Sequence, residues 1–164
     1  MRILGIDPGT INMGYGIVET HDGMRAIDFG ILNVASQTIM ENRLCYLYDG
    51  LTKIIRMSSP DEVAIEQQFL GKNVHTAFAI GAAKTVAILA AVKQKLPIFY
   101  YSPTQVKQNV TSYGRSDKSQ VQEMVRIQLG LSEPPKPYDA ADALAVAICH
   151  ICCSQFERWV SERS

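Results

Sequence analysis

The sequence lacks the two features that would place a protein in or across a membrane. No uninterrupted apolar stretch reaches the length of about 20 residues that spans a bilayer. The N-terminal segment MRILGIDPGT also lacks the charged n-region, the apolar h-region and the small-residue cleavage site of a secretory signal peptide. These absences predict a cytoplasmic protein with no membrane partner.

Cysteine and histidine are too sparse to build a disulfide framework or a zinc site. Three of the four cysteines, Cys149, Cys152 and Cys153, lie together in the late apolar segment CHICC. Without an export signal, these thiols are expected to stay reduced. No second Cys/His pair is available to complete a tetrahedral metal shell. We therefore interpret CHICC as small side chains packed inside a helix.

A net charge of one sign is also absent, but the charges are unevenly distributed. The 164 residues contain 16 basic and 16 acidic side chains, which argues against a protein that coats nucleic acid indiscriminately. Between residues 67 and 126, however, eight residues are basic and two are acidic. A basic stretch in a neutral chain is typical of a local site for a polyanion. Solvated helix faces are the alternative interpretation.

The length and the order of the expected elements predict one α/β domain over residues 1–164. Apolar runs bounded by turn residues indicate strands, and apolar residues at helical spacing indicate helices. Strands are expected at 2–7, 14–20, 24–34, 62–66 and 98–102, and helices at 39–57, 73–95, 103–111, 117–129 and 138–160. Three antiparallel strands followed by alternating helices and strands predict a mixed five-stranded sheet with helices on both faces.

Acidic residues end two of these strands and begin the last helix. Asp7 follows the apolar run ILGI, Glu66 follows VAI, and Asp139 and Asp142 lie one helical turn apart in PYDAADALA. A carboxylate among core residues is costly to bury unless a positive group lies beside it. Capping of the helix is an alternative role for Asp139. Asp142 is harder to explain in that way, because its neighbours are apolar.

A divalent cation would explain why three or four carboxylates are embedded in core-like sequence. Converging carboxylates repel one another and raise each other's pKa values. Mg²⁺ removes this repulsion and prefers a few carboxylates, water molecules and a phosphate oxygen as ligands. Two such ions about 3.5–4 Å apart form the arrangement that supports in-line phosphodiester hydrolysis. Mn²⁺ accepts the same ligands and is a substitute.

Five motifs occur in order along the chain: ILGIDPGT-x3-GYG, AIEQ-x-F-x-x-KN, QVKQ, DKSQVQ-x-MV and DAADALAVAI. Together they resemble the RuvC family, the bacterial Holliday-junction resolvases, and the resemblance runs over roughly residues 2–153. GIDPGT alone would be a weak signal, because it also resembles the phosphate loops of sugar-kinase-type ATPases. The ordered set is far more specific.

The resemblance implies an RNase H-like fold, a homodimer and Mg²⁺-dependent, symmetric nicking of two opposed strands at a four-way DNA junction during recombination and repair. It also implies cooperation with the RuvA–RuvB branch-migration complex. The family's four catalytic acids, which would bind two Mg²⁺ ions in each site, correspond to Asp7, Glu66, Asp139 and Asp142.

The resemblance and the basic stretch also indicate residues that contact DNA. Phe69, in the loop QQFLGKN, corresponds to the family's junction-contacting aromatic. Stacking of such a ring on an unpaired base is worth about 1–3 kcal/mol, and folding back onto the core is the alternative. Lys107 and Lys118 correspond to the family's DNA-binding lysines. Lys72 and Arg115 are further candidates for phosphate contacts, with a solvated surface position as the alternative.

The Ala/Gly-rich helix expected at 73–95 is a candidate for part of the dimer interface, because a two-fold junction suits a two-fold dimer. Close packing within the monomer is the alternative.

The sequence leaves three alternative functions: a phosphate-binding ATPase or kinase lobe, an RNase H-like scaffold that does not cut, and a nuclease for RNA–DNA hybrids. The absence of a second phosphate segment opposes the first, the four acids oppose the second, and the Phe69 loop and expected dimer oppose the third.

Overall fold

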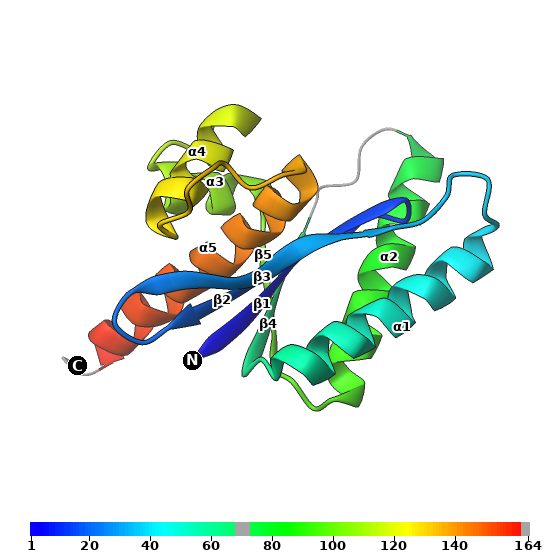
Figure 1. Ribbon diagram of the computed structural model, residues 1–164, viewed down its shortest axis with the longest axis horizontal. Helices are drawn as coiled ribbons and strands as arrows, with labels where there is room; N and C mark the ends of the chain where they lie inside the picture. Colours follow the sequence, from blue (N-terminus) through cyan, green and yellow to red (C-terminus); the bar gives the residue numbers. More distant parts are fainter. Residues whose placement is uncertain (68–72, 162–164) are drawn as a thin grey trace.

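The computed structural model, which describes residues 1–67 and 73–161, has a single five-stranded sheet at its centre (Figure 1). The strands are β1 (Arg2–Asp7), β2 (Asn12–Thr20), β3 (Met24–Asn33), β4 (Glu62–Glu66) and β5 (Ile98–Tyr101). They lie in the order β3-β2-β1-β4-β5. The pairs β1–β2 and β2–β3 are antiparallel, whereas β1–β4 and β4–β5 are parallel. The mixed sheet predicted from the sequence is therefore confirmed.

Helices cover both faces of this sheet, as the sequence predicts. They are α1 (Met40–Ser58), α2 (Val74–Lys93), α3 (Pro103–Thr111), α4 (Lys118–Gln128) and α5 (Tyr138–Ser161). In Figure 1, α1 and α2 lie on one side of the sheet, and α3, α4 and α5 lie on the other. Capping boxes fix the starts of α3 and α4, where Ser102 and Asp117 accept the backbone N–H of the residue three positions later.

Side-chain alternation along β1 divides the core into two clusters. Leu4 and Ile6 pack toward α1 and α2, whereas Ile3 packs in the cluster formed with α5, α3 and α4. Successive side chains of a strand point to opposite faces of the sheet. Gly5 and Asp7 therefore lie on the same face as Ile3, toward α5. Because of this alternation, Asp7 at the end of β1 faces α5, the helix that carries Asp139 and Asp142.

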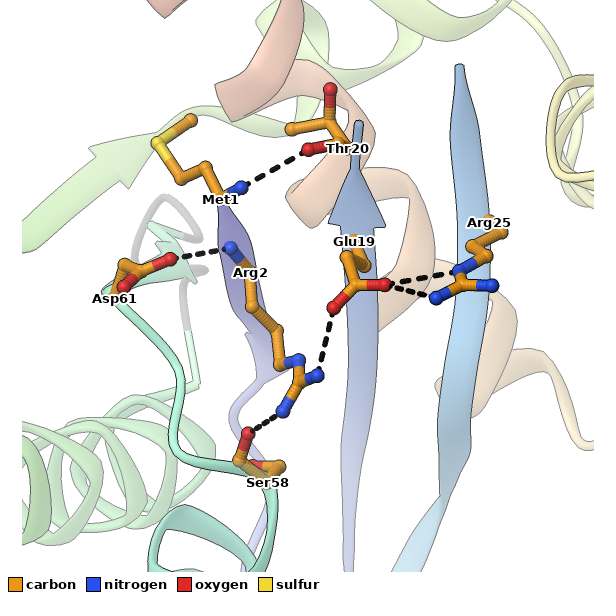
Figure 2. Close-up of polar contacts among 7 residues, drawn as sticks. All are labelled: Met1, Arg2, Glu19, Thr20, Arg25, Ser58 and Asp61. Atoms are coloured by element: carbon orange, nitrogen blue, oxygen red, sulfur yellow. Dashed lines mark hydrogen bonds and ion pairs between the residues drawn. The ribbon is translucent and has the colours of Figure 1, made fainter. Parts of the chain in front are cut away.

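Hydrogen bonds and ion pairs link the N-terminal end of β1 to β2 and to the end of α1 (Figure 2). The Arg2 guanidinium donates to Glu19 Oε1 at 2.7 Å and to the Ser58 carbonyl, while the Arg2 backbone N–H donates to Asp61 Oδ2 at 2.7 Å. Arg25 donates to the second oxygen of Glu19. Hydrogen bonds from Arg25 and Arg2 lower the pKa of Glu19 to about 2. Glu19 therefore stays ionised at every physiological pH, at the end of the sheet remote from Asp7.

A buried polar network joins α5 to β4 and β5. The ring of His150, which is 1% exposed, lies between Tyr101 Oη, 2.7 Å from Nδ1, and Glu62 Oε2, 2.6 Å from Nε2. The Phe99 ring stacks on the imidazole with a centroid distance of 4.4 Å. The carboxylate of Glu62 is the acceptor at Nε2, and the Tyr101 hydroxyl is the hydrogen-bond partner of Nδ1.

We expect Tyr101→Phe to lower the free energy of unfolding by about 1–3 kcal/mol, because it leaves the buried Nδ1 of His150 without this hydrogen-bond partner. Urea denaturation measures the effect. Tyr100→Phe is the matched control: Tyr100 is exposed and its ring contacts Lys84 Nζ, an interaction that phenylalanine retains. Equal stability of the two variants would contradict the assignment of the hydrogen bond.

Candidate active site and family

Five elements, β1, β4, α3, α4 and α5, surround one pocket with a volume of about 470 Å³. The structure brings all four predicted acids and two of the three predicted lysines, Lys107 and Lys118, to its lining. The lining residues are Asp7, Glu66, Pro103, Lys107, Lys118, Val121, Asp139 and Asp142. These residues come from distant parts of the sequence and from both ends of the chain. The pocket is therefore the candidate active site.

Two of the acids reach the pocket because β1 and β4 are parallel neighbours. Ile6 lies opposite Ile65 in the register, and the strands end one residue later, at Asp7 and Glu66. Strands that run in the same direction end at the same edge of a sheet. Asp7 is 8% exposed and is thus almost entirely enclosed by protein. The parallel pairing therefore brings the two terminal carboxylates to the same edge of the sheet.

Glycine on β1 and β2 allows the backbone of α5 to lie directly against the sheet. Gly14 is the partner of Asp7 in the β1–β2 ladder, and a Cβ atom on Gly14 would lie 2.0 Å from the Asp139 carbonyl oxygen. A Cβ atom on Gly5 would lie 2.0 Å from the Ala143 carbonyl oxygen. No side chain fits at these distances. The first turn of α5, with Asp139, is consequently held against the end of β1.

Lysine side chains supply the positive charge that the sequence leads us to expect beside these acids. Lys118 Nζ lies 3.7 Å from Asp142 Oδ2. Burial raises the pKa of Asp142, and the charge of Asp139 raises it further; Lys118 opposes both effects. Lys107 acts in the same direction as Lys118 but more weakly. The two lysines therefore offset only part of the effect of burial on the pKa of Asp142.

We expect Asp142→Asn to raise the free energy of unfolding of the metal-free protein at neutral pH. The native pKa of Asp142 lies above its unfolded value, so the native state binds this proton more readily, and ionisation disfavours folding. The gain should be absent below the ordinary aspartate pKa of about 3.9 and should grow as pH rises through the raised native pKa. Urea denaturation in EDTA at several pH values measures it. Asp49→Asn, at an exposed position of α1, is the matched control, and a gain in Asp142→Asn that is independent of pH would contradict the assignment.

The donor chemistry of the pocket fits a hard divalent cation. Within residues 1–67 and 73–161, no three His, Cys, Asp or Glu side chains form a ready-made metal cage. Mg²⁺ does not require one, because it retains several water molecules and binds through one or two carboxylates together with substrate phosphates. Four carboxylates around one pocket provide the necessary oxygen ligands. The softer donors of CHICC lie elsewhere: Cys149 is buried, and Cys152 and Cys153 are partly buried, on α5.

The predicted DNA-contacting residues are only partly covered by the described structure. Lys107 on α3 and Lys118 at the start of α4 line the pocket. Arg115 is exposed in the loop between these helices. Phe69 and Lys72 lie outside the described residues. Their roles remain predictions from the sequence.

Sequence reasoning missed one aromatic side chain, which contacts Lys118 of this pocket. The Tyr138 ring begins α5, and its centroid is 5.8 Å from Lys118 Nζ. Its position directly before Asp139 was the available signal. That signal was incomplete, because only the folded structure shows that Lys118 lies over the ring.

Comparison with known proteins agrees with the geometry. The family model for crossover junction endodeoxyribonuclease RuvC matches residues 3–150. The chain is 52% identical over 151 residues to RuvC of Chloroflexus aggregans, covering 92% of each chain. It is 51% identical over 156 residues to RuvC of Caldicellulosiruptor saccharolyticus, covering 94% of each.

Solved structures lead to the same family. The chain superimposes on Thermus thermophilus RuvC in complex with a Holliday junction substrate with a TM-score of 0.91 and 31% identity, over 96% of each chain. The yeast mitochondrial Holliday junction resolvase shares the fold, with a TM-score of 0.62 at 16% identity. The predicted RNase H-like fold is confirmed. The chain belongs to the RuvC family of crossover junction endodeoxyribonucleases.

Proposed function

We propose that this protein is a structure-selective endodeoxyribonuclease that resolves Holliday junctions by nicking two opposed strands. The observation that carries the proposal is the pocket in which four acids and two lysines meet. Carboxylates supply metal ligands, and lysines supply contacts for the phosphates of a nucleic acid. The similarity to a RuvC solved with a Holliday junction substrate supports a junction as the DNA.

We further propose that Asp7, Glu66, Asp139 and Asp142 hold two Mg²⁺ ions, with Mn²⁺ as a substitute. When bound, the ions would activate the attacking water and offset negative charge at the scissile phosphate. Three features of the chain support this role: the acids share one pocket, they are hard oxygen donors, and burial already raises the pKa of Asp142 in the absence of a cation.

Basic side chains at the pocket would hold the DNA strand. Lys107 and Lys118 line the pocket, and Arg115 is exposed on the loop between α3 and α4. Phosphate contacts from these residues would make binding depend on salt concentration. They would also keep the scissile phosphate close to the acids, which supplies proximity rather than proton transfer.

Cleavage of a labelled four-way junction tests the proposed function, with linear duplex and an RNA–DNA hybrid of the same sequence as controls. Each substrate is incubated with Mg²⁺, with Mn²⁺ or with EDTA. We expect paired symmetric nicks on the junction alone and only with metal. Cutting of the hybrid alone would favour the RNA-directed alternative. Tight junction binding without cutting in any metal would favour the scaffold alternative.

The outward face of α2 supports a homodimer. Four large apolar side chains are exposed on this helix: Val74, Phe78, Leu89 and Val92. In the part of the chain that the structure describes, α2 is also the one helix long and apolar enough to cross a membrane. Its opposite side, however, is buried against the core through Ala83, Ala87 and Ala91. A helix anchored to its own domain with an apolar outer face is typical of a protein interface.

We expect Phe78→Glu to weaken dimerisation by about 30-fold or more, because it places a charge in the apolar face of α2. Sedimentation velocity over a range of concentrations measures the change. Ile127→Glu is the matched control, since Ile127 is 55% exposed on α4, across the sheet from α2. A dimer that survives Phe78→Glu but is disrupted by Ile127→Glu would move the interface to the other face.

We also propose that the chain acts as a single nuclease domain in the cytoplasm, alongside the RuvA–RuvB branch-migration complex. Family membership supports this proposal. Addition of purified RuvA and RuvB to the junction assay tests it. A higher rate of resolution is the expected result, and an unchanged rate would oppose functional cooperation.

A further inference from the structure

Lys118 lies between two side chains at the mouth of the pocket. Its Nζ atom is 3.7 Å from Asp142 Oδ2 and 5.8 Å from the centroid of the Tyr138 ring. The lysine side chain is 65% exposed, so nothing buries it in place. Long exposed lysine side chains are flexible. These two contacts therefore decide where the ammonium group stays.

The ion pair alone is a weak restraint on Lys118. Exposed lysine–carboxylate pairs contribute little, because water screens the charges and the side chain loses conformational freedom. Asp142 is also one of the proposed metal ligands, and a carboxylate that binds a cation attracts the lysine less strongly. Tyr138 is not a proposed metal ligand, so metal binding leaves its contact with Lys118 in place. It is thus the contact on which the position of Lys118 depends when the site is in use.

The backbone that carries the Tyr138 ring is fixed at the start of α5. Tyr138 is the first residue of α5, directly before Asp139, and Lys118 is the first residue of α4. Gln122 of α4 donates from Nε2 to the Pro135 carbonyl at 2.6 Å, which links α4 to the segment that leads into α5. A tyrosine ring has only two side-chain torsions to fix. Tyr138 is 46% exposed, so packing in the core does not explain an aromatic side chain at this position.

We propose that Tyr138 is a positioning residue for DNA cleavage: its ring holds the Lys118 ammonium over the pocket by a cation–π interaction. Lysine within about 6 Å of an aromatic centroid is attracted by the electron-rich face of the ring. In this position the ammonium group would contact the scissile phosphate of DNA bound at the four acids. This inference rests on the proposed function for the identity of that phosphate, but the contact itself is a property of the protein alone.

A double-mutant cycle tests the proposal. The variants are Tyr138→Leu, Tyr138→Phe, Lys118→Met and the double variant Tyr138→Leu/Lys118→Met. Single-turnover cutting of a junction in Mg²⁺ is measured for each, with the unfolding free energy as a check on folding. We expect Tyr138→Leu to slow cutting about two- to fivefold, Tyr138→Phe to retain the wild-type rate, and Tyr138→Leu to have no further effect in the Lys118→Met background.

Two outcomes would overturn the proposal. Equal losses from Tyr138→Leu and Tyr138→Phe would assign the effect to the hydroxyl group. The same loss from Tyr138→Leu with and without Lys118 would mean that the ring acts on the DNA or the fold directly. Tyr113→Leu, at an aromatic residue that is 59% exposed on the loop before α4, is the matched control and should act independently of Lys118.

A second readout separates this proposal from the proposed function. Protons on the Lys118 ε-carbon should show an upfield ring-current shift by NMR in wild type and in Tyr138→Phe, and should lose it in Tyr138→Leu. This measurement needs neither DNA nor metal. If the wild type fails to cut junctions, the proposed function fails, while the NMR shift still decides whether the ring holds the lysine. An absent shift in wild type would refute the contact.

Discussion

Replacing Asp7 with asparagine is expected to reduce junction cutting by about 10²–10³-fold or more, while junction binding stays within about twofold. Asparagine has the same shape as aspartate but lacks the negative charge that a divalent cation requires. Asp7 is 8% exposed at the end of β1, in the pocket that holds the other three acids. Its substitution therefore removes one of the proposed metal ligands without altering the lysines proposed to contact phosphate.

Single-turnover cutting and equilibrium binding to the same labelled junction separate the two effects. Asp22→Asn is the matched control, because the Asp22 side chain is 96% exposed in the β2–β3 turn and lies outside the pocket. It should cut as wild type does. Parallel losses of cutting and of folded protein in Asp7→Asn would show that Asp7 serves the fold, and nearly normal cutting would remove it from the catalytic set.

Gly14→Ala is expected to destabilise the protein and to slow cutting, although it leaves every polar side chain in place. The added Cβ atom would lie 2.0 Å from the Asp139 carbonyl oxygen, so that β2 and α5 must separate. Overpacking of this kind costs about 1–3 kcal/mol, and more where backbone must move. Because the displaced turn of α5 carries Asp139, cutting should fall even under conditions in which the variant is fully folded.

Gly81→Ala in α2 is the matched control for the added methyl group. No atom lies within 4 Å of a Cβ at Gly81, and alanine is favoured over glycine by about 1 kcal/mol in a helix interior. Urea denaturation should thus show opposite signs for the two variants. Similar stability and similar cutting rates for both would mean that the backbone contact between α5 and β2 does not position the acid.

The secondary structure was largely determined by local sequence. Every predicted strand and helix forms, and each boundary lies within two residues of the prediction. The reason is that the signals are local: apolar periodicity, turn residues and helix caps such as Ser102 and Asp117 act over a few neighbouring residues. The acids at the ends of β1 and β4 were noticeable for the same reason, since each interrupts an apolar run.

The sequence by itself thus determined the elements, the mixed sheet and the acids that its motifs mark. Tertiary structure alone decided how these parts meet. The contact of Gly14 with α5, the bridge from His150 to Tyr101 and Glu62, and the placement of Lys118 over Tyr138 all join segments far apart in the chain. Periodicity carries no information about such pairings. They follow from which faces pack together once the sheet and its helices have formed.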